Sequence, residues 1–408
     1  MKYSVITFGC RVNQADSLQI EDSLRQRGGE ACGPDDAELL IVNSCSVTAS
    51  ADQGVRQTVR RVARANPDVR VVVTGCYASR CPDEVATLPN VVRVVSNQQK
   101  DEFGEVLEAI GLGDATRFAT GEGPCGATLE PGVAGRTAFT LRVQTGCDEP
   151  CSYCIIPTTR GRSRSRHSVD VLNDVARAIE AGYKEIALTG VHLGSYGRDL
   201  PTGGSLLDLV RALAQQPADV LFRISSLEPM DCTPALVDLV AASPRLAPHL
   251  HLPLQHGSDR ILRSMKRPYT AAAYTDIVRH VRRLMPTASL GTDLIVGFPG
   301  ETDDDFQQMV DVVTALPLSY LHVFPYSDRP DTAASKMPGK VPGELVRARA
   351  RVLRAIGEQK VRVFRTAQAG TRRKALTVDD GLSAVTDNYL KVALPAQHAR
   401  NQWIQALI

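Results

Sequence analysis

The chain has 408 residues, of which 43% are hydrophobic and 23% charged, with a formal net charge of +2 at pH 7. This length exceeds one ordinary domain, and this balance is typical of a globular protein and excludes a disordered one. The sequence contains no apolar run of about 18 residues and no signal-peptide pattern, so we expect no membrane span and a cytoplasmic location.

The first 110 residues alternate apolar and amphipathic segments. We predict strands over 3–8, 38–42, 69–74 and 91–95, with helices that include 14–27 and 50–65. Strands separated by helices indicate an open parallel sheet, and thus the α/β class. Residues 111–135 are rich in Gly, Ala and Thr, and they contain Pro124 and Pro131. This composition predicts a linker to a second domain.

Residues 136–364 show a longer alternation of strands and helices. The predicted strands cover 138–143, 185–189, 221–225, 249–254, 289–296 and 320–324. The predicted helices between them cover 169–181, 206–215, 234–242, 271–284 and 304–316. Six β/α units in a row predict a partial (β/α)6 barrel, which a helix over 343–364 closes. Residues 365–408 predict a small β module with strands near 375–378 and 389–392.

Three cysteines with the spacing C-x3-C-x2-C follow the first barrel strand: Cys147, Cys151 and Cys154. The C-terminal end of a strand is where barrels carry their active sites. Three thiolates on one loop ligate three irons of a 4Fe–4S cluster and leave the fourth iron for a small molecule. The alternatives are incidental cysteines or a zinc loop, although zinc needs a fourth ligand and His167 lies beyond the loop.

This spacing resembles the signature of radical S-adenosylmethionine enzymes, with Tyr153 at the usual aromatic position before the last cysteine. The resemblance implies that the open iron binds S-adenosylmethionine and that one electron cleaves this cofactor to a 5′-deoxyadenosyl radical. It also implies cofactor contacts at the strand ends, at Thr189, Gly190, Ser225, Ser226, Glu228, Gln255, Ser258, Asp293 and Val296. Ordinary packing or helix capping is the alternative for each of these residues.

Cys10, Cys45 and Cys76 each follow one of three consecutive predicted strands. The carboxyl ends of parallel strands meet at one crevice, so we expect these thiols to lie together and to hold a second 4Fe–4S cluster. Asn13 and Asn43 flank the same crevice as candidate substrate contacts. The alternative is three buried cysteines at strand ends. The other four cysteines have no partner that the sequence indicates: Cys32, Cys81, Cys125 and Cys232.

Eight segments resemble the methylthiotransferase family in order and spacing: FGCRVNQADS, VNSC, TGC, GCDEPCSYCIIPTTRGRSRSR, SSLEP, LPLQHGSD, DLIVGFPGET and HVFPYS. The resemblance implies that the N-terminal cluster carries the sulfur that is inserted, as sulfide or methylsulfide on its open iron. It also implies two molecules of S-adenosylmethionine, one to methylate the sulfur and one to make the radical. The cysteines of both triads are then the catalytic groups. A side-chain base cannot remove hydrogen from an unactivated carbon, so no acid–base dyad is expected.

FGCRVNQADS and TGVHLGSYGRDL resemble the MtaB-type branch of this family, as do residues 386–389. That branch modifies C2 of N6-threonylcarbamoyladenosine at position 37 of tRNA, next to the anticodon. The branch for N6-isopentenyladenosine usually has a Gln-Asn segment where this chain has Val191 and His192. That branch, the branch for a ribosomal-protein aspartate, a non-catalytic iron–sulfur protein and a zinc-binding RNA protein remain alternatives.

Four arginines alternate after the cysteine loop: Arg160, Arg162, Arg164 and Arg166. In an extended segment they would project to one side and grip substrate phosphates. The expected partners are tRNA, a reducing electron donor and a sulfur source, with no membrane and no DNA. The resemblance implies a C-terminal TRAM barrel that grips tRNA. The tail after Phe364 spans only 44 residues (408 minus 364), so we expect an incomplete or divergent barrel.

Overall fold

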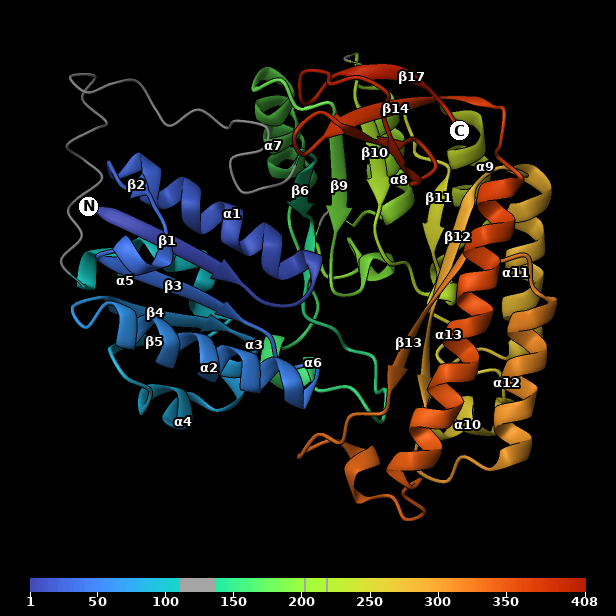
Figure 1. Cartoon of the computed structure of the whole chain (residues 1–408), viewed down its shortest axis with the longest axis horizontal. Coiled ribbons are helices and arrows are strands. Elements are labelled where there is room, and N and C mark those ends of the chain that lie inside the picture. The colour runs from blue at the N-terminus through green and yellow to red at the C-terminus, as the bar shows by residue number, and fades with distance from the viewer. Residues whose placement is uncertain (111–136, 202, 218) are drawn as a thin grey trace.

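The computed structural model describes residues 1–110, 137–201, 203–217 and 219–408. It contains an N-terminal α/β sheet, a barrel of parallel strands and a small antiparallel C-terminal sheet (Figure 1). The predicted linker over 111–135, with Cys125, lies outside the described residues. Within the described part of the chain, no helix is long and apolar enough to cross a membrane.

The N-terminal sheet is parallel and open, as predicted, with the strand order β2-β1-β3-β4-β5. Its strands are β1 (Lys2–Thr7), β2 (Glu30–Ala31), β3 (Leu39–Ser44), β4 (Arg70–Gly75) and β5 (Val91–Val95). Its helices are α1 (Arg11–Gln26), α2 (Ala49–Ala65), α3 (Cys76–Arg80), α4 (Pro82–Ala86) and α5 (Phe103–Ala109). The central strand β3 is buried at every position because helices cover both faces of such a sheet. The short edge strand β2 was not predicted.

Six parallel strands form the partial barrel, which confirms the predicted architecture. They are β6 (Phe139–Arg142), β9 (Glu185–Thr189), β10 (Leu221–Ile224), β11 (His249–His251), β12 (Ser289–Val296) and β13 (Tyr320–Pro325). A parallel bridge between Ser226 and His251 joins the β6-β9-β10 group to the β11-β12-β13 group. The covering helices are α7 (Ser168–Glu180), α8 (Leu206–Ala214), α9 (Pro234–Ala242), α10 (Asp259–Ser264), α11 (Ala271–Leu284), α12 (Asp303–Ala315) and α13 (Gly343–Thr366).

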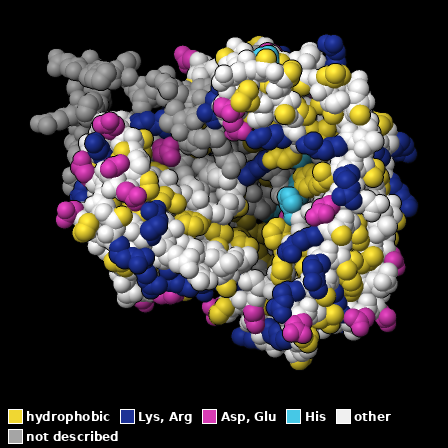
Figure 2. All heavy atoms as spheres, in the orientation of Figure 1, with side chains coloured by type: hydrophobic (Ala, Val, Ile, Leu, Met, Phe, Trp, Pro, Cys, Tyr) yellow, Lys and Arg dark blue, Asp and Glu magenta, His cyan; other side chains and the backbone are white. Residues whose placement is uncertain are grey.

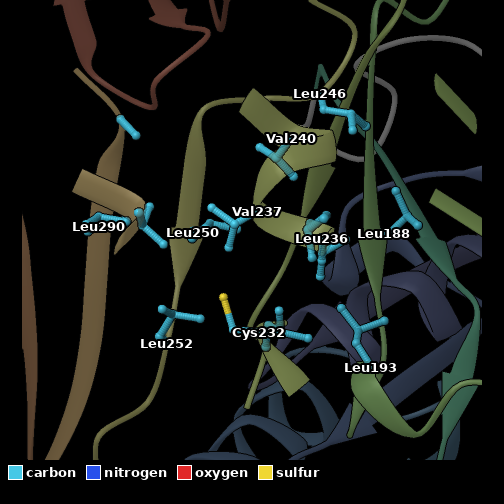
Figure 3. Packing of buried hydrophobic residues seen from close by; sticks show 14 of the residues in the cluster. Leu188, Leu193, Cys232, Leu236, Val237, Val240, Leu246, Leu250, Leu252 and Leu290 are labelled. Carbon is cyan, nitrogen blue, oxygen red and sulfur yellow. The ribbon is translucent and has the colours of Figure 1, made fainter. Parts of the chain in front are cut away.

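The barrel strands bury apolar side chains on one face only. Leu188, Leu250 and Leu290 pack outward against helices such as α9. Val237 of α9 and Cys232, which precedes this helix, join the same core (Figure 3). Successive residues of a strand point to opposite faces. The intervening side chains therefore face the barrel interior, and many of them are polar or charged: Glu185, Arg223, Ser225, His249, His251, Asp293 and His322.

The C-terminal module is an antiparallel sheet with the order β16-β15-β14-β17. Its strands are β14 (Arg372–Val378), β15 (Ser383–Thr386), β16 (Lys391–Ala393) and β17 (Trp403–Leu407). Two of these four strands were predicted. The module lies over the end of the barrel where β9 and β10 begin (Figure 1). Arg223 of β10 fixes it there by donating to the backbone carbonyls of Asp387 and Thr386.

A buried carboxylate joins the N-terminal domain to the barrel. Asp16 of α1 accepts hydrogen bonds from Lys100 at 2.8 Å, Arg142 at 2.7 Å and Arg160 at 3.0 Å. Arg142 ends β6, and Arg160 ends the short helix α6 (Ile156–Arg160), so two of the three cations belong to the barrel domain. Burial raises the pKa of Asp16, but the three cations outweigh burial and hold that pKa well below its usual value.

We predict that Asp16→Asn lowers the free energy of unfolding by about 3–5 kcal/mol, because it leaves buried cations without their carboxylate. Urea denaturation followed by circular dichroism measures this loss. Because the pKa of Asp16 is depressed, its stabilisation is complete above the ordinary carboxyl pKa and is lost as the pH falls toward the native value. The exposed Asp68 is the control, since Asp68→Asn should change stability by less than about 0.5 kcal/mol. Equal effects of the two substitutions would contradict the prediction.

Candidate active site: two cysteine triads and the barrel interior

The first cysteine triad lies on the loop that follows β7 (Gln144–Thr145). Gly146 begins this loop with φ of +72°, and a Cβ there would lie 1.9 Å from the carbonyl oxygen of Arg162. Only glycine therefore permits this turn. The amide of Cys154 donates to the carbonyl of Cys151 at 3.2 Å, which closes the loop. Burial raises the pKa of Cys147 to about 11 and that of Cys154 to about 12.

Two basic side chains that the sequence analysis missed approach this loop. Arg267 donates from Nη1 to Sγ of Cys151 at 2.9 Å and also pairs with Glu228. His192 Nδ1 lies 3.8 Å from Sγ of Cys147, and its Nε2 lies 2.7 Å from a carboxylate oxygen of Asp231. Both residues come from loops far along the chain, so no local spacing linked them to the cysteines.

The second triad gathers at the carboxyl edge of the N-terminal sheet, on the neighbouring strands β1, β3 and β4. Cys10 is the N-cap of α1, Cys45 follows β3 directly, and Cys76 begins α3. Burial raises the pKa of Cys45 to about 11, and the charges of Cys76 and Cys10 contribute to the rise. Gly9 is needed beside them because a Cβ there would lie 2.6 Å from Sγ of Cys45.

The donor chemistry of both triads fits iron–sulfur clusters. A thiol with a raised pKa stays protonated at neutral pH unless a cationic metal centre binds it as thiolate. A single zinc ion holds sulfur ligands about 2.3 Å from itself and hence within about 4 Å of one another. In the described part of the chain, neither triad brings its three sulfur atoms within 4.8 Å of one another. A 4Fe–4S cluster does not require so close an approach, because each sulfur binds a different iron.

The helix α6 ties the two triads together. It follows the cysteine loop and packs against α3, which begins with Cys76 (Figure 1). Asn97 donates from Nδ2 to the carbonyl of Thr159 in α6 at 2.9 Å, and the same nitrogen lies 3.6 Å from Sγ of Cys76. The contact between α6 and α3, together with Asn97, therefore connects the cysteine loop to the helix that begins with Cys76. Figure 2 shows a hollow between the N-terminal domain and the barrel, with histidine side chains in its wall.

Most of the predicted cofactor residues lie where the barrel strands end. Thr189 ends β9 and Gly190 follows it, while Ser226 lies just after β10 as an exposed residue. Glu228 pairs with Arg267 beside the cysteine loop. Gln255 has φ of +67°, and its backbone bonds with Asp293 and Ile295 of β12. Tyr153 packs beside α10 in a small apolar cluster. These positions agree with cofactor contacts, which remain predictions.

Asp293 forms a polar cluster with two histidines inside the barrel. Its Oδ1 lies 2.8 Å from Nε2 of His251 and 3.1 Å from Nδ1 of His322. Burial raises the pKa of Asp293, but the hydrogen bonds from the histidines outweigh it and lower that pKa to about 2. Tyr320 lies against the same cluster, with its hydroxyl 3.0 Å from His251. The cluster fixes a negative charge on β12, between the neighbouring strands β11 and β13.

Two of the predicted cofactor side chains have other roles. Ser258 is buried and donates to Asp305 at 2.7 Å, which ties the start of α10 to α12. Val296 points into the hydrophobic core, and its carbonyl accepts a hydrogen bond from the amide of Tyr326. The structure therefore gives Ser258 a hydrogen bond that joins two helices and gives Val296 a packing role.

The two predicted asparagine contacts are buried beneath the crevice. Asn13 donates to the carbonyls of Phe8 and Ser44, and Asn43 donates to the carbonyl of Asn13. Neither side chain is exposed, so each holds the backbone that carries the cysteines. A direct contact of these residues with substrate is not supported.

The arginines after the cysteine loop do not form one row. Arg160 lies in α6 and is buried against Asp16 and Asn13, so it cannot grip phosphates. A helix replaced the expected extended segment at this point. Arg164 is exposed, and Arg162 has a side chain that is 92% exposed beside Asp148. Arg166 pairs with Asp174 at 2.7 Å. These last three remain candidates for contact with RNA.

The other described cysteines lie outside both triads. Cys232 is buried in the barrel core, where burial raises its pKa to about 12 (Figure 3). Cys32 is partly buried, and its Sγ lies 3.5 Å from the carbonyl oxygen of Tyr3. Cys81 is also partly buried, between α3 and α4. Packing accounts for all three.

Comparisons with known proteins decide the family. The model of the Radical SAM superfamily matches residues 141–313, and that of Uncharacterized protein family UPF0004 matches residues 2–97. The threonylcarbamoyladenosine tRNA methylthiotransferase MtaB of Aquifex aeolicus is 35% identical over 100% of both chains. This chain belongs to the tRNA methylthiotransferase family. As a radical SAM methylthiotransferase it uses S-adenosylmethionine and a 4Fe–4S cluster, and its cysteine loop lies inside the matched segment.

Other relatives of this methylthiotransferase are named for one of two tRNA substrates. MtaB of Bacillus subtilis is 32% identical over 95% of this chain and 88% of its own. The tRNA-2-methylthio-N(6)-dimethylallyladenosine synthase of Chloroflexus aurantiacus is 36% identical over 82% of this chain and 72% of its own. Among solved structures, the radical S-adenosylmethionine methyltransferase TsrM of Kitasatospora setae has a TM-score of 0.59 at 16% identity, covering 82% of this chain and 74% of that one. That likeness shows the shared fold.

We predict that Arg267→Ala lowers the reduction potential of the 4Fe–4S cluster on the cysteine loop by about 60 mV or more, since Cys151 loses a charged hydrogen-bond donor. A redox titration of the anaerobically reconstituted methylthiotransferase, read by electron paramagnetic resonance, measures the shift. Arg279 is exposed on α11 and supplies the control variant Arg279→Ala. A potential that stays at the wild-type value in Arg267→Ala would contradict a role for this contact.

Proposed function

We propose that this methylthiotransferase inserts a methylthio group at C2 of N6-threonylcarbamoyladenosine at position 37 of tRNA. The observation that carries the proposal is the full-length similarity to relatives named for this activity, which spans both cysteine triads and the C-terminal module. The hollow between the two domains offers a place where a base extruded from the anticodon loop reaches both triads.

We infer that Cys10, Cys45 and Cys76 hold a second 4Fe–4S cluster. The strand ends of one sheet gather these thiols, and the chemistry of the donors suits a cluster. With both clusters and S-adenosylmethionine bound, the cofactors supply the radical and the sulfur. The chain's own residues hold the cysteines at a fixed separation, through α6 and Asn97, and keep Asp293 ionised inside the barrel.

The exposed arginines beside the loop, Arg162 and Arg164, suit contact with tRNA phosphates. The proposed reaction also needs a reducing electron donor and a sulfur source. We propose a cytoplasmic location for the protein because its proposed substrate is tRNA. N6-isopentenyladenosine is the second candidate substrate, because relatives named for the dimethylallyladenosine reaction are about as similar in sequence.

The two-cluster proposal predicts about eight irons per chain after anaerobic reconstitution, the content of two 4Fe–4S clusters. Replacing Cys10, Cys45 and Cys76 together by alanine should leave about four irons, and so should replacing Cys147, Cys151 and Cys154. Iron and acid-labile sulfide are the quantities to measure. If the first triple variant kept all of the wild-type iron, the N-terminal triad would be structural.

The substrate proposal predicts methylthiolation of an anticodon stem-loop that carries N6-threonylcarbamoyladenosine. Mass spectrometry of the digested RNA detects the product, and a stem-loop with N6-isopentenyladenosine serves as the competitor. The variant without Cys10, Cys45 and Cys76 should still cleave S-adenosylmethionine to 5′-deoxyadenosine and should make no methylthio product. A wild-type protein that modified only the isopentenyl stem-loop would reject the proposed substrate.

A further inference from the structure

Arg11 belongs to the N-terminal domain and contacts both the barrel and the C-terminal module. It begins α1 directly after Cys10. Its Nη1 donates to Oγ of Ser225 at the end of β10 at 3.2 Å, and its Nη2 donates to the hydroxyl of Tyr389 in the C-terminal module at 2.8 Å. The N-terminal domain thus places a guanidinium at the interior face of the barrel.

The charge of Arg11 has no acidic partner within the described residues, because both groups that it contacts are neutral hydroxyls. The other arginines that reach the barrel interior are paired. Arg223 forms two hydrogen bonds with Glu185, at 2.9 and 3.0 Å, and Arg142 binds Asp16. A guanidinium has five N–H donors, so Arg11 keeps donors available for a further acceptor.

Arg11 lines a cavity of about 520 Å³ between the barrel and the C-terminal module. Tyr389 lies in its wall, with the guanidinium carbon of Arg11 5.6 Å from the ring centre. The ring of Tyr389 stacks on His249 at 4.4 Å, so the surface under the guanidinium is fixed. The two acidic side chains that line the cavity already have basic partners, since Glu185 pairs with Arg223 and Asp379 pairs with Lys391.

We propose that Arg11 binds the carboxylate of the threonyl group on the substrate adenosine and so selects this substrate. This inference rests on the proposed function. N6-threonylcarbamoyladenosine ends in a carboxylate, which a guanidinium binds with two parallel hydrogen bonds. The isopentenyl substituent is an uncharged hydrocarbon, and packing it against a cation that lacks a counter-charge is unfavourable. The same side chain therefore attracts one substituent and disfavours the other.

The test pairs a change in the enzyme with a change in the substrate. One stem-loop carries N6-threonylcarbamoyladenosine and the other carries its methyl ester, which lacks the negative charge. We expect wild-type kcat/KM to favour the acid by about tenfold to a hundredfold, the effect of a charged hydrogen-bonded pair. Arg11→Gln should abolish the preference, and Arg11→Lys should keep part of it. Arg279→Gln removes a positive charge on exposed α11 and should keep the wild-type preference.

Tyr389→Phe is the second variant, because it leaves the residues next to Cys10 intact and removes only the hydroxyl that orients Arg11. It should reduce the preference for the acid by about threefold to tenfold, the effect of a single neutral hydrogen bond. If Arg11→Gln and Tyr389→Phe both kept the full preference while methylthiolating the acid, the inference would be wrong and the proposed function would stand. A wild-type protein active only on isopentenyl RNA would overturn both.

Discussion

The buried carboxylate of Asp16 is the contact on which the arrangement of the site depends. Its three cations come from a 3-10 turn of the N-terminal domain, from β6 and from α6, so a single side chain fixes the sheet, the barrel and the helix after the cysteine loop. An ionised group buried at a domain interface is tolerated only with complete pairing. That requirement allows essentially one relative position of the two cysteine triads.

Other buried charged side chains in the described interior are paired in the same way. Arg223, Arg267 and Asp293 each have partners of opposite sign or histidines. Burial raises the pKa values of Cys45, Cys147 and Cys154, whose thiolates a bound metal centre would stabilise. Arg11 departs from this pattern, since it meets only hydroxyls. Among the described residues of the site, Arg11 is therefore the cation at which we expect a negatively charged ligand to bind.

The sequence predicted what local periodicity and spacing encode. The six barrel strands, the parallel N-terminal sheet and the strand-end position of Cys45 and Cys76 followed from alternating patterns. The patterns did not show that residues after Cys154 form a helix, which buried Arg160 instead of exposing it. They also did not show Arg267 beside Cys151 or Tyr389 beside Arg11. Those contacts join residues more than a hundred positions apart, and only the folded chain brings them together.

The position of Tyr389 in the C-terminal module has a consequence for the order in which the chain folds during synthesis. The strand that follows it, β16, pairs with β15, and β14 binds β15 on one side and β17 on the other. Because β17 (Trp403–Leu407) is the last strand of this sheet along the chain, the sheet can close only after residues 403–407 have been synthesised. A chain cut before β17 would carry both cysteine triads but would lack the strand that pairs with β14, whose Leu376 and Val378 line the cavity at Arg11. Loss of β17 would therefore disturb the support of Tyr389 and leave both cysteine triads in the chain.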